Sequence, residues 1–212
     1  MSDHTSKQGC LITFEGIDGA GKSTHIEAIA QALRKRGMTV RLTREPGGTA
    51  LGESLRELVL NHPMTPETET LMMFAARAEH LAQVIRPALA AGQWVLCDRF
   101  TDATYAYQAG GRGLQEIQIE KLEKWVHPHL QPDLTILFDV APAVAAERSA
   151  RRRQPPGADR FEREPLLFFE SVRAMYPKRA NADSDRFLIV DTERPAETVR
   201  NHLIEFMERW NG

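Results

Sequence analysis

The stretch Gly16-Ile17-Asp18-Gly19-Ala20-Gly21-Lys22-Ser23 fits the pattern G-x-x-x-x-G-K-[ST]. An apolar run at 11–15 precedes it and a helical pattern at 24–36 follows it, which is the context that this pattern requires. Glycines let backbone N–H groups converge on phosphate oxygens, and the following helix adds unpaired N–H groups and partial positive charge. Lys22 can reach the β- and γ-phosphates, and Ser23 can ligate Mg²⁺. Together with Thr24, the stretch predicts a binding site for ATP or GTP.

Five short runs rich in apolar and β-branched residues alternate with helical patterns along the 212-residue chain. Most are continuously apolar, as expected for strands buried on both faces of a parallel sheet. This alternation predicts one three-layer α/β domain over 10–212, with five parallel strands flanked by helices, after a loosely held tail at 1–9. The predicted strands are Leu11–Glu15, Val40–Arg44, Trp94–Asp98, Leu134–Val140 and Phe187–Asp191. The predicted helices are 21–36, 50–61, 66–91, 114–127, 142–153, 164–180 and 196–210.

Composition argues against several classes of protein. A formal charge of −2 gives no global attraction to nucleic acid or to an anionic membrane, so a local cluster of basic residues must hold any anion. No stretch approaches 18 apolar residues, and residues 1–9 lack the apolar segment of a signal peptide. Cys10 and Cys97 have no metal-ligand spacing and are expected to be buried, reduced thiols. We therefore expect a cytoplasmic protein.

Charged residues gather where the predicted strands end, and in an open parallel sheet ligands bind at the carboxyl ends of the strands. Glu15, Asp98 and Asp139 end three of the runs or lie beside their ends. Asp98 closes the run WVLCD and is the expected Walker-B acid that holds Mg²⁺ together with Ser23. Arginine suits bidentate recognition of phosphate. The arginines near strand ends, or in the loops after them, are Arg44, Arg56, Arg99 and Arg112.

Four further motifs resemble those of the bacterial thymidylate kinase family. Three of them are TREPGGT at 43–49, DRF at 98–100 and TYAYQAGGRG at 104–113. The fourth, DRFE at 159–162, follows a segment rich in Arg, Pro and Gly. The resemblance covers residues 10–165 and implies a three-layer P-loop kinase fold. It also implies a homodimer that moves the γ-phosphoryl group of ATP, with Mg²⁺, onto thymidylate (dTMP) for deoxynucleotide synthesis.

The resemblance assigns residues to the acceptor nucleotide. Arg77 matches an arginine that binds the base, one turn after a phenylalanine that stacks on thymine. That phenylalanine position falls on Met73, with Phe74 one place away, so both residues are candidates. Thr104 and Tyr107 match positions near the base and the 2′ side of the sugar, and Tyr107 would block a 2′-hydroxyl. Gln108 belongs to the same AYQ motif and is assigned to the same pocket.

Phosphoryl transfer needs positive groups around the transferring oxygens. Besides Lys22, the resemblance assigns Arg56 and Arg99 to the acceptor phosphate. A carboxylate at Asp18 would repel phosphate unless it pairs with Mg²⁺ or with an acceptor hydroxyl, and the resemblance places it near the acceptor sugar. No general base is expected, because a phosphate monoester with a second pKa near 6 is mostly dianionic at neutral pH.

The Arg-rich segment is expected to form a small mobile lid at about 148–162. Gly19 stands where some family members carry an arginine beside the γ-phosphate, so the transition-state charge must be met from elsewhere. The family's bacterial branch carries a catalytic arginine on the lid, and Arg152 is its nearest match here, with Arg151 and Arg153 as neighbours. The resemblance also predicts a cis peptide bond between Glu45 and Pro46.

Other hypotheses remain open from the sequence. The chain could be a P-loop kinase for another nucleoside monophosphate or small molecule. A GTPase should carry the motif N-K-x-D, which the sequence lacks, and a motor would need a second module for which 212 residues leave little room. Nucleic-acid binding through 148–153 is opposed by the acidic balance and by the lack of aromatic residues within this run. The pair His127 and His129 lies in a loop-like segment and is expected to be exposed to solvent.

Overall fold

The computed structural model of the chain describes residues 9–152 and 159–210. Five parallel strands form one sheet in the order β2-β3-β1-β4-β5. The strands are β1 (Cys10–Glu15), β2 (Val40–Arg44), β3 (Trp94–Asp98), β4 (Leu134–Asp139) and β5 (Phe187–Asp191). The five-stranded parallel sheet is confirmed, and every strand lies within one residue of its predicted bounds.

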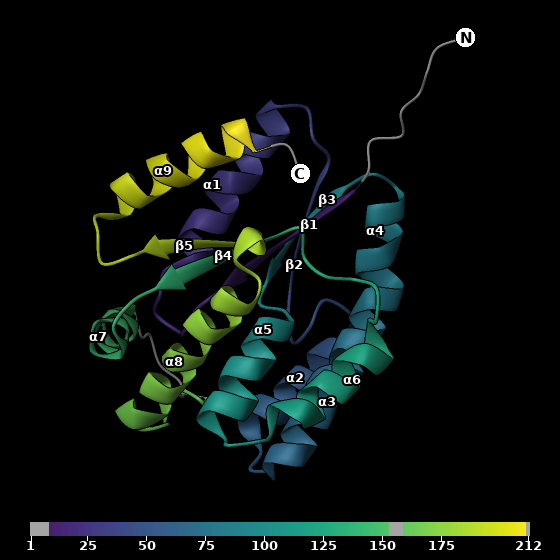
Figure 1. Cartoon of the computed structure of the whole chain (residues 1–212), viewed down its shortest axis with the longest axis vertical. Helices are drawn as coiled ribbons and strands as arrows, with labels where there is room; N and C mark the ends of the chain where they lie inside the picture. The colour runs from purple at the N-terminus through teal and green to yellow at the C-terminus, as the bar shows by residue number, and fades with distance from the viewer. Residues whose placement is uncertain (1–8, 153–158, 211–212) are drawn as a thin grey trace.

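Helices cover both faces of the sheet (Figure 1). On one face lie α1 (Lys22–Lys35) and α9 (Ala196–Arg209), and on the other lie α4 (Arg86–Ala90), α5 (Thr101–Thr104) and α8 (Leu166–Ala182). The remaining α-helices are α2 (Ala50–Asn61), α3 (Pro66–His80), α6 (Glu116–Val126) and α7 (Pro142–Arg152). None of the helices in the described ranges has the length and apolar character needed to cross a membrane.

Side chains of β1 alternate between the two faces of the sheet, as the period of two requires. Ile12 and Phe14 belong to the larger core, which includes the apolar faces of α1 and α9. Leu11 belongs to a second core with Leu81 and Ile85. The same alternation turns Glu15, the last residue of the strand, toward the face that carries α5 and α8. A buried carboxyl therefore lies below the phosphate loop.

The prediction of one continuous helix at 66–91 is wrong. This segment is divided into α3, a π-helical turn (Leu81–Ile85) and α4, in which Pro87 lies in the first turn. Proline lacks the N–H that an interior helix position must donate, so it is tolerated at the start of a helix. A π-helical turn inserts a residue into the helical register, which changes the face that each later side chain presents.

A helical segment over 101–111 was not predicted. It comprises α5 and a second π-helical stretch (Tyr105–Gly111) and contains most of the AYQ motif. Two glycines, poor helix formers, hid this helix in the sequence. Glycine is needed at both positions because α8 approaches closely. A Cβ atom at Gly110 would lie 2.8 Å from the Ser171 carbonyl oxygen, and one at Gly111 would lie 2.4 Å from the Phe168 ring.

Candidate active site

The phosphate loop follows β1, and its glycines Gly16, Gly19 and Gly21 have φ angles of 132°, 85° and 92°. Such angles are readily available only to glycine. Lys22 is 6% exposed, and its Nζ donates hydrogen bonds to the carbonyl oxygens of Gly16 (2.9 Å) and Ile17 (3.2 Å). Burial, and then the charge of Arg99, lower the pKa of Lys22 to about 8.

One pocket collects most of the charged groups that the sequence assigned to phosphate and metal. It is lined by Asp18, Gly19, Gly21, Lys22, Ser23, Arg44, Glu45, Arg56, Asp98 and Arg99. Ile17 and Ala20 are buried, and Thr24 is exposed in the first turn of α1. Asp98 Oδ1 is buried without a hydrogen-bond partner among the described residues. A carboxylate and a hydroxyl are ligands that suit Mg²⁺, so Asp98 and Ser23 fit the predicted metal.

Arg99 lines this pocket and bonds to several groups around it. Its Nη1 donates to the Gly16 carbonyl oxygen (2.9 Å), and its Nη2 donates to Asp18 Oδ1 (2.7 Å) and to the Tyr107 hydroxyl (3.0 Å). The Tyr107 hydroxyl in turn donates to Asp18 Oδ2 (3.1 Å). Partial loss of hydration opposes ionisation of Asp18, whose side chain is partly exposed, but the charges of Arg99 and Lys22 lower its pKa to about 2. Asp18 was expected to need Mg²⁺ or an acceptor hydroxyl, but Arg99 and Tyr107 already neutralise and bind it.

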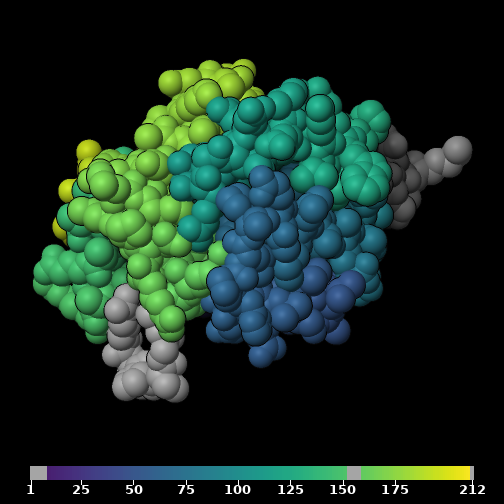
Figure 2. Space-filling view, turned by 90° about the horizontal axis from the view of Figure 1, so that it is seen from below, coloured from purple at the N-terminus to yellow at the C-terminus, as the bar shows by residue number. Residues whose placement is uncertain are grey.

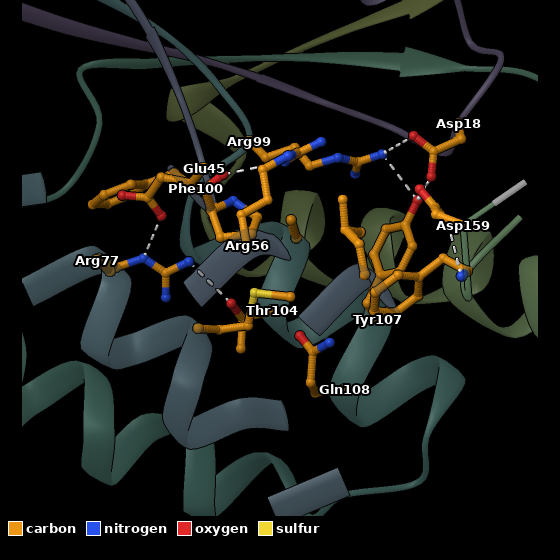
Figure 3. A pocket seen from close by; sticks show the side chains of 15 residues that line it. Asp18, Glu45, Arg56, Arg77, Arg99, Phe100, Thr104, Tyr107, Gln108 and Asp159 are labelled. Carbon is orange, nitrogen blue, oxygen red and sulfur yellow. Dashed lines mark hydrogen bonds and ion pairs between the residues drawn. The ribbon is translucent and has the colours of Figure 1, made fainter. Parts of the chain in front are cut away.

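A second pocket adjoins the first and shares Asp18, Glu45, Arg56 and Arg99 with it. Figure 3 shows Asp18 and Arg77 at opposite ends of this pocket. Every residue assigned to the acceptor lines it except Phe74. Those residues are Arg56, Met73, Arg77, Arg99, Thr104, Tyr107 and Gln108. Helices α2 and α3, the loop after β3 and the helical segment over 101–111 thus bring the acceptor candidates together.

Phe74 does not contribute to the pocket, and this part of the prediction is wrong. Its ring is buried with Tyr105 and Ile119 and stacks on the His127 ring, with centroids 6.4 Å apart. Successive residues of a helix are turned by about 100°, so the neighbour Met73 faces the pocket and Phe74 faces the core. His127 is also buried, contrary to expectation, and it bonds to the Thr101 hydroxyl (2.9 Å) and the Leu130 carbonyl oxygen (3.0 Å).

Arg77 lies in the wall of the pocket and is held there by two hydrogen bonds. Its Nε donates to Glu45 (2.7 Å) and its Nη2 donates to the Thr104 hydroxyl (3.0 Å), whereas Nη1 is buried without a partner among the described residues. Its guanidinium lies 5.1 Å from the centre of the Phe100 ring. Burial alone would raise the pKa of Glu45, but Arg77 and His80 lower it. The guanidinium is therefore fixed in a wall that is almost fully buried, and its Nη1 group has no hydrogen-bond partner among the described residues.

The peptide bond between Glu45 and Pro46 is cis, which confirms the prediction. Arg56 Nη1 donates to the Pro46 carbonyl oxygen (3.1 Å), which holds the arginine at the junction of the two pockets. Sequence analysis gave no role to several lining residues, namely Glu45, Phe100, Asp159 and Phe161. All four belong to the motifs quoted above, and this membership could have identified them as pocket residues. Among the described residues, Asp139 and Arg112 lie outside both linings.

The segment expected to form a lid is described only in part. Residues 153–158, with Arg153, lie outside the described residues, and Arg152 ends α7. Beyond the gap, Arg160 donates to the Val59 carbonyl oxygen (3.1 Å) and pairs with Glu69 of α3. On the other side of the gap, α7 packs against the phosphate loop, because a Cβ atom at Gly19 would lie 2.3 Å from the Ala145 carbonyl oxygen.

Glu15 is a fully buried carboxyl beneath the phosphate loop. Its Oε1 accepts the Phe100 N–H (2.8 Å) and its Oε2 accepts the Tyr176 hydroxyl (3.1 Å). Burial, and then the nearby Asp102 carboxylate, raise the pKa of Glu15 from 4.5 to about 8. A carboxyl with such a pKa is mainly protonated at neutral pH.

The Glu15→Gln variant is expected to remove one source of pH-dependent stability. Between pH 4.5 and about 8 the unfolded chain releases the Glu15 proton while the folded chain keeps it. The stability contributed by the protonated carboxyl is therefore full below pH 4.5 and is lost as the pH rises through 8. Thermal unfolding should be measured for the parent and for Glu15→Gln from pH 5 to 9. As the pH rises, the Tm of the variant should increase relative to that of the parent, and the difference should become constant above about pH 8. A difference that stays constant over the whole pH range would contradict the raised pKa.

Known proteins that are similar to this chain are thymidylate kinases. A family model described as thymidylate kinase matches residues 14–203. A thymidylate kinase from Bordetella pertussis is 60% identical over 196 residues, covering 92% of this chain and 93% of the relative. One from Methylobacillus flagellatus is 55% identical over 205 residues, covering 97% and 100%. The crystal structure of thymidylate kinase from Ehrlichia chaffeensis is 31% identical, with a TM-score of 0.75, covering 94% and 99%. The chain belongs to the thymidylate kinase family.

Proposed function

We propose that this protein catalyses the ATP-dependent phosphorylation of dTMP to dTDP in deoxynucleotide synthesis. The observation that carries the proposal is the junction of the two pockets. Arg56, Arg99 and Asp18 line both the pocket of the phosphate loop and the pocket that ends at Arg77. A nucleotide bound in the second pocket with its base at Arg77 would present its phosphate to the donor site. The remaining alternative is a P-loop kinase for another nucleoside monophosphate or small molecule.

Residues Gly16 to Thr24 bind the ATP phosphates, with Lys22 at the β- and γ-phosphates. Ser23 and Asp98 would hold Mg²⁺, which would supply charge neutralisation when bound. An oxygen of the acceptor phosphate attacks the γ-phosphorus, the bond from that phosphorus to the bridging oxygen breaks, and ADP leaves. The attacking oxygen is already ionised, so no proton has to be removed. Lys22 and Arg99 stabilise charge on the transferring group.

The acceptor is held along the second pocket. Arg56 and Arg99 bind its phosphate, and the guanidinium of Arg99 exchanges part of its contact with Asp18 for the phosphate oxygens. Arg77, which Glu45 and Thr104 hold in place, lies at the end of the pocket that receives the base. Thr104 and Gln108 line the same end, and the Met73 thioether packs on the base, as methionine does on aromatic rings.

The Tyr107→Ala variant is expected to accept ribonucleotides. The Tyr107 ring is buried, and its hydroxyl is fixed by Asp18 and Arg99, so it forms a rigid wall beside the sugar. A cavity in its place would admit a 2′-hydroxyl. The ratio of kcat/KM for dTMP to that for ribothymidine monophosphate should fall by about tenfold or more, a change of about 1.4 kcal/mol. The matched control Tyr107→Phe keeps the ring and should keep the preference. If Tyr107→Ala discriminates as strongly as the parent, the sugar is selected elsewhere.

We also infer one domain at 10–212 with a lid at about 148–162, acting as a homodimer in the cytoplasm. Two buried, free thiols suit a reducing compartment. Figure 2 shows α2 and α3 (blue) beside α6 (teal) on one face. Large apolar side chains are exposed on these helices, among them Trp125 at 79%. The others are Leu51, Leu58, Leu71 and Ile117. Burial of this face against a second copy supports the dimer, which analytical ultracentrifugation tests.

The function is tested by a coupled assay of ADP release with dTMP, dUMP, UMP, CMP, AMP and GMP as acceptors. We expect kcat/KM to be highest for dTMP. A higher value for another monophosphate would replace the acceptor while keeping the reaction class. No ADP release with any of them, from a folded protein that binds ATP, would contradict the proposed function.

A further inference from the structure

Arg99 has an unfavourable backbone conformation at the point where it enters the site. Of the non-glycine residues that the structure describes, Arg99 alone has a positive φ, at 69°. A side chain in this left-handed region clashes with its own backbone, so the conformation persists only where surrounding contacts hold it. The residues that supply those contacts therefore contribute to placing the guanidinium.

The backbone of Arg99 is held from both sides of its Cα atom. Its N–H donates to the Phe14 carbonyl oxygen (2.9 Å), and its carbonyl oxygen accepts the Cys97 thiol (3.0 Å). The next N–H, of Phe100, donates to Glu15 Oε1 at 2.8 Å. This last bond is made by a side chain rather than by the sheet, so a single substitution can remove it.

The other oxygen of Glu15 reaches toward the far end of the same arginine. Oε2 accepts the buried Tyr176 hydroxyl at 3.1 Å, and this hydroxyl lies 3.5 Å from Nη1 of Arg99. The Glu15 carboxyl is therefore linked to Arg99 in two ways, through the amide of the next residue, Phe100, and through the Tyr176 hydroxyl. It touches neither of the two pockets itself.

We propose that Glu15 is a positioning residue that holds the Arg99 backbone through the Phe100 amide and the Arg99 guanidinium through Tyr176. The proposal rests on the proposed function, in which Arg99 binds the acceptor phosphate. Loss of this support lets the Arg99 backbone relax toward a negative φ and moves the guanidinium away from the phosphate. Misplacement of a catalytic group by about 1 Å can cost about 10²-fold in rate.

The electrostatic surroundings of Glu15 suit a neutral carboxyl in this role. Lys22 and Arg99 favour its ionised form, while burial and Asp102 oppose it. Tyr176 and Cys97 also face it. Asp102 is itself held as an anion by Arg186 (2.7 Å) and Arg179 (2.9 Å). A second negative charge at Glu15 would weaken the field that Arg99 offers to a phosphate. Glutamine is thus a close mimic of the neutral Glu15 carboxyl, because it is uncharged and keeps an acceptor oxygen for the Phe100 amide.

The test compares Glu15→Leu, Glu15→Gln and Tyr176→Phe with the parent, measuring dTMP kinetics and the ADP dissociation constant. We expect Glu15→Leu to lower kcat/KM for dTMP by about 10²-fold and Tyr176→Phe to lower it by about tenfold. Glu15→Gln should stay within about threefold of the parent, and ADP affinity should stay within about twofold in all three variants. Crystal structures of the variants report φ of Arg99. Asp133→Asn is the matched control, because the Asp133 carboxylate also accepts a backbone N–H, that of Leu11, but at the opposite end of β1 from Glu15.

Several outcomes would overturn the proposal. One is dTMP kinetics within about threefold of the parent for both Glu15→Leu and Tyr176→Phe. Another is equal loss of ADP and dTMP binding, which indicates a merely structural role. An equal loss of kcat/KM for dTMP in Glu15→Gln and Glu15→Leu would show that the hydrogen bond to the Phe100 amide is not what places Arg99. If Glu15→Leu does not fold, Tyr176→Phe decides alone. If the parent itself lacks dTMP kinase activity, the proposed function fails, and φ of Arg99 in the variant structures still decides whether Glu15 holds this backbone.

Discussion

Replacing Lys22 with alanine is expected to abolish measurable phosphoryl transfer, a loss of at least about 10³-fold in kcat. The Lys22 Nζ binds two carbonyl oxygens of the phosphate loop and lies in the donor pocket. A bound nucleotide offers this ammonium group phosphate oxygens in place of carbonyl oxygens, and charge-assisted bonds to phosphate are stronger. Loss of the ammonium leaves developing charge on the transferring group without its nearest cation.

The same substitution should leave the fold intact. The apolar face of α1 is formed by Ile26, Ile29 and Leu33, and none of these contacts depends on the Lys22 charge. Lys35→Ala is the matched control, because it removes an exposed lysine from the last turn of the same helix. Steady-state kinetics and thermal unfolding of both variants separate catalysis from stability. Near-normal turnover by a folded Lys22→Ala protein would refute the assignment of the phosphate loop.

The strands could be predicted from the sequence because their signal is local. Strands buried on both faces are continuously apolar, and turn residues bound each run. The helix over 101–111 escaped prediction because Gly110 and Gly111 lower helix propensity, whereas the close approach of α8 is what selects them. A propensity argument considers the chain alone and cannot include a neighbour that arrives from 60 residues downstream.

Motifs predicted most of the candidate site because they are compact sequence signatures. The choice between Met73 and Phe74 was different, since it depends on the rotation of α3 about its axis. Packing of Phe74 on His127 fixes that rotation, and His127 comes from a distant loop. The pocket that ends at Arg77 therefore has a thioether, rather than a benzyl ring, at this position of its wall.

The support beneath Arg99 could not be predicted at all. Tyr176 and Arg186 come from the last third of the chain, where the sequence showed only generic helix and strand. They meet Glu15 and Asp102 across 161 and 84 residues of sequence. Such contacts leave no short motif, because each partner is a single polar residue in an otherwise ordinary element. Only the folded structure brings the carboxyl, the phenol and the strained arginine together.

The Arg152→Ala variant is expected to lower kcat by about 10³-fold with a much smaller change in KM for dTMP. The phosphate loop has no room for a cation at position 19, because α7 packs there through Ala145 and Ser149. Positions 145, 149 and 152 follow the i, i+4, i+7 spacing of one helix face. From helical periodicity we therefore expect position 152 to share the face of α7 that meets the loop. A cation brought there only in the transition state changes kcat more than ground-state binding.

Arg151→Ala is the matched control, because it removes an arginine from the same helix end but from another face. Arg151 is exposed and pairs with Glu147 one turn earlier, an interaction of the kind that contributes about 0.3–0.5 kcal/mol. Its loss, and that of Arg153, should change kcat by less than about threefold. If Arg152→Ala and a triple variant at 151–153 also keep kcat within a few-fold, this run is only a solvated face. The catalytic cation would then be Arg99, since Arg160 is already held by Val59 and Glu69.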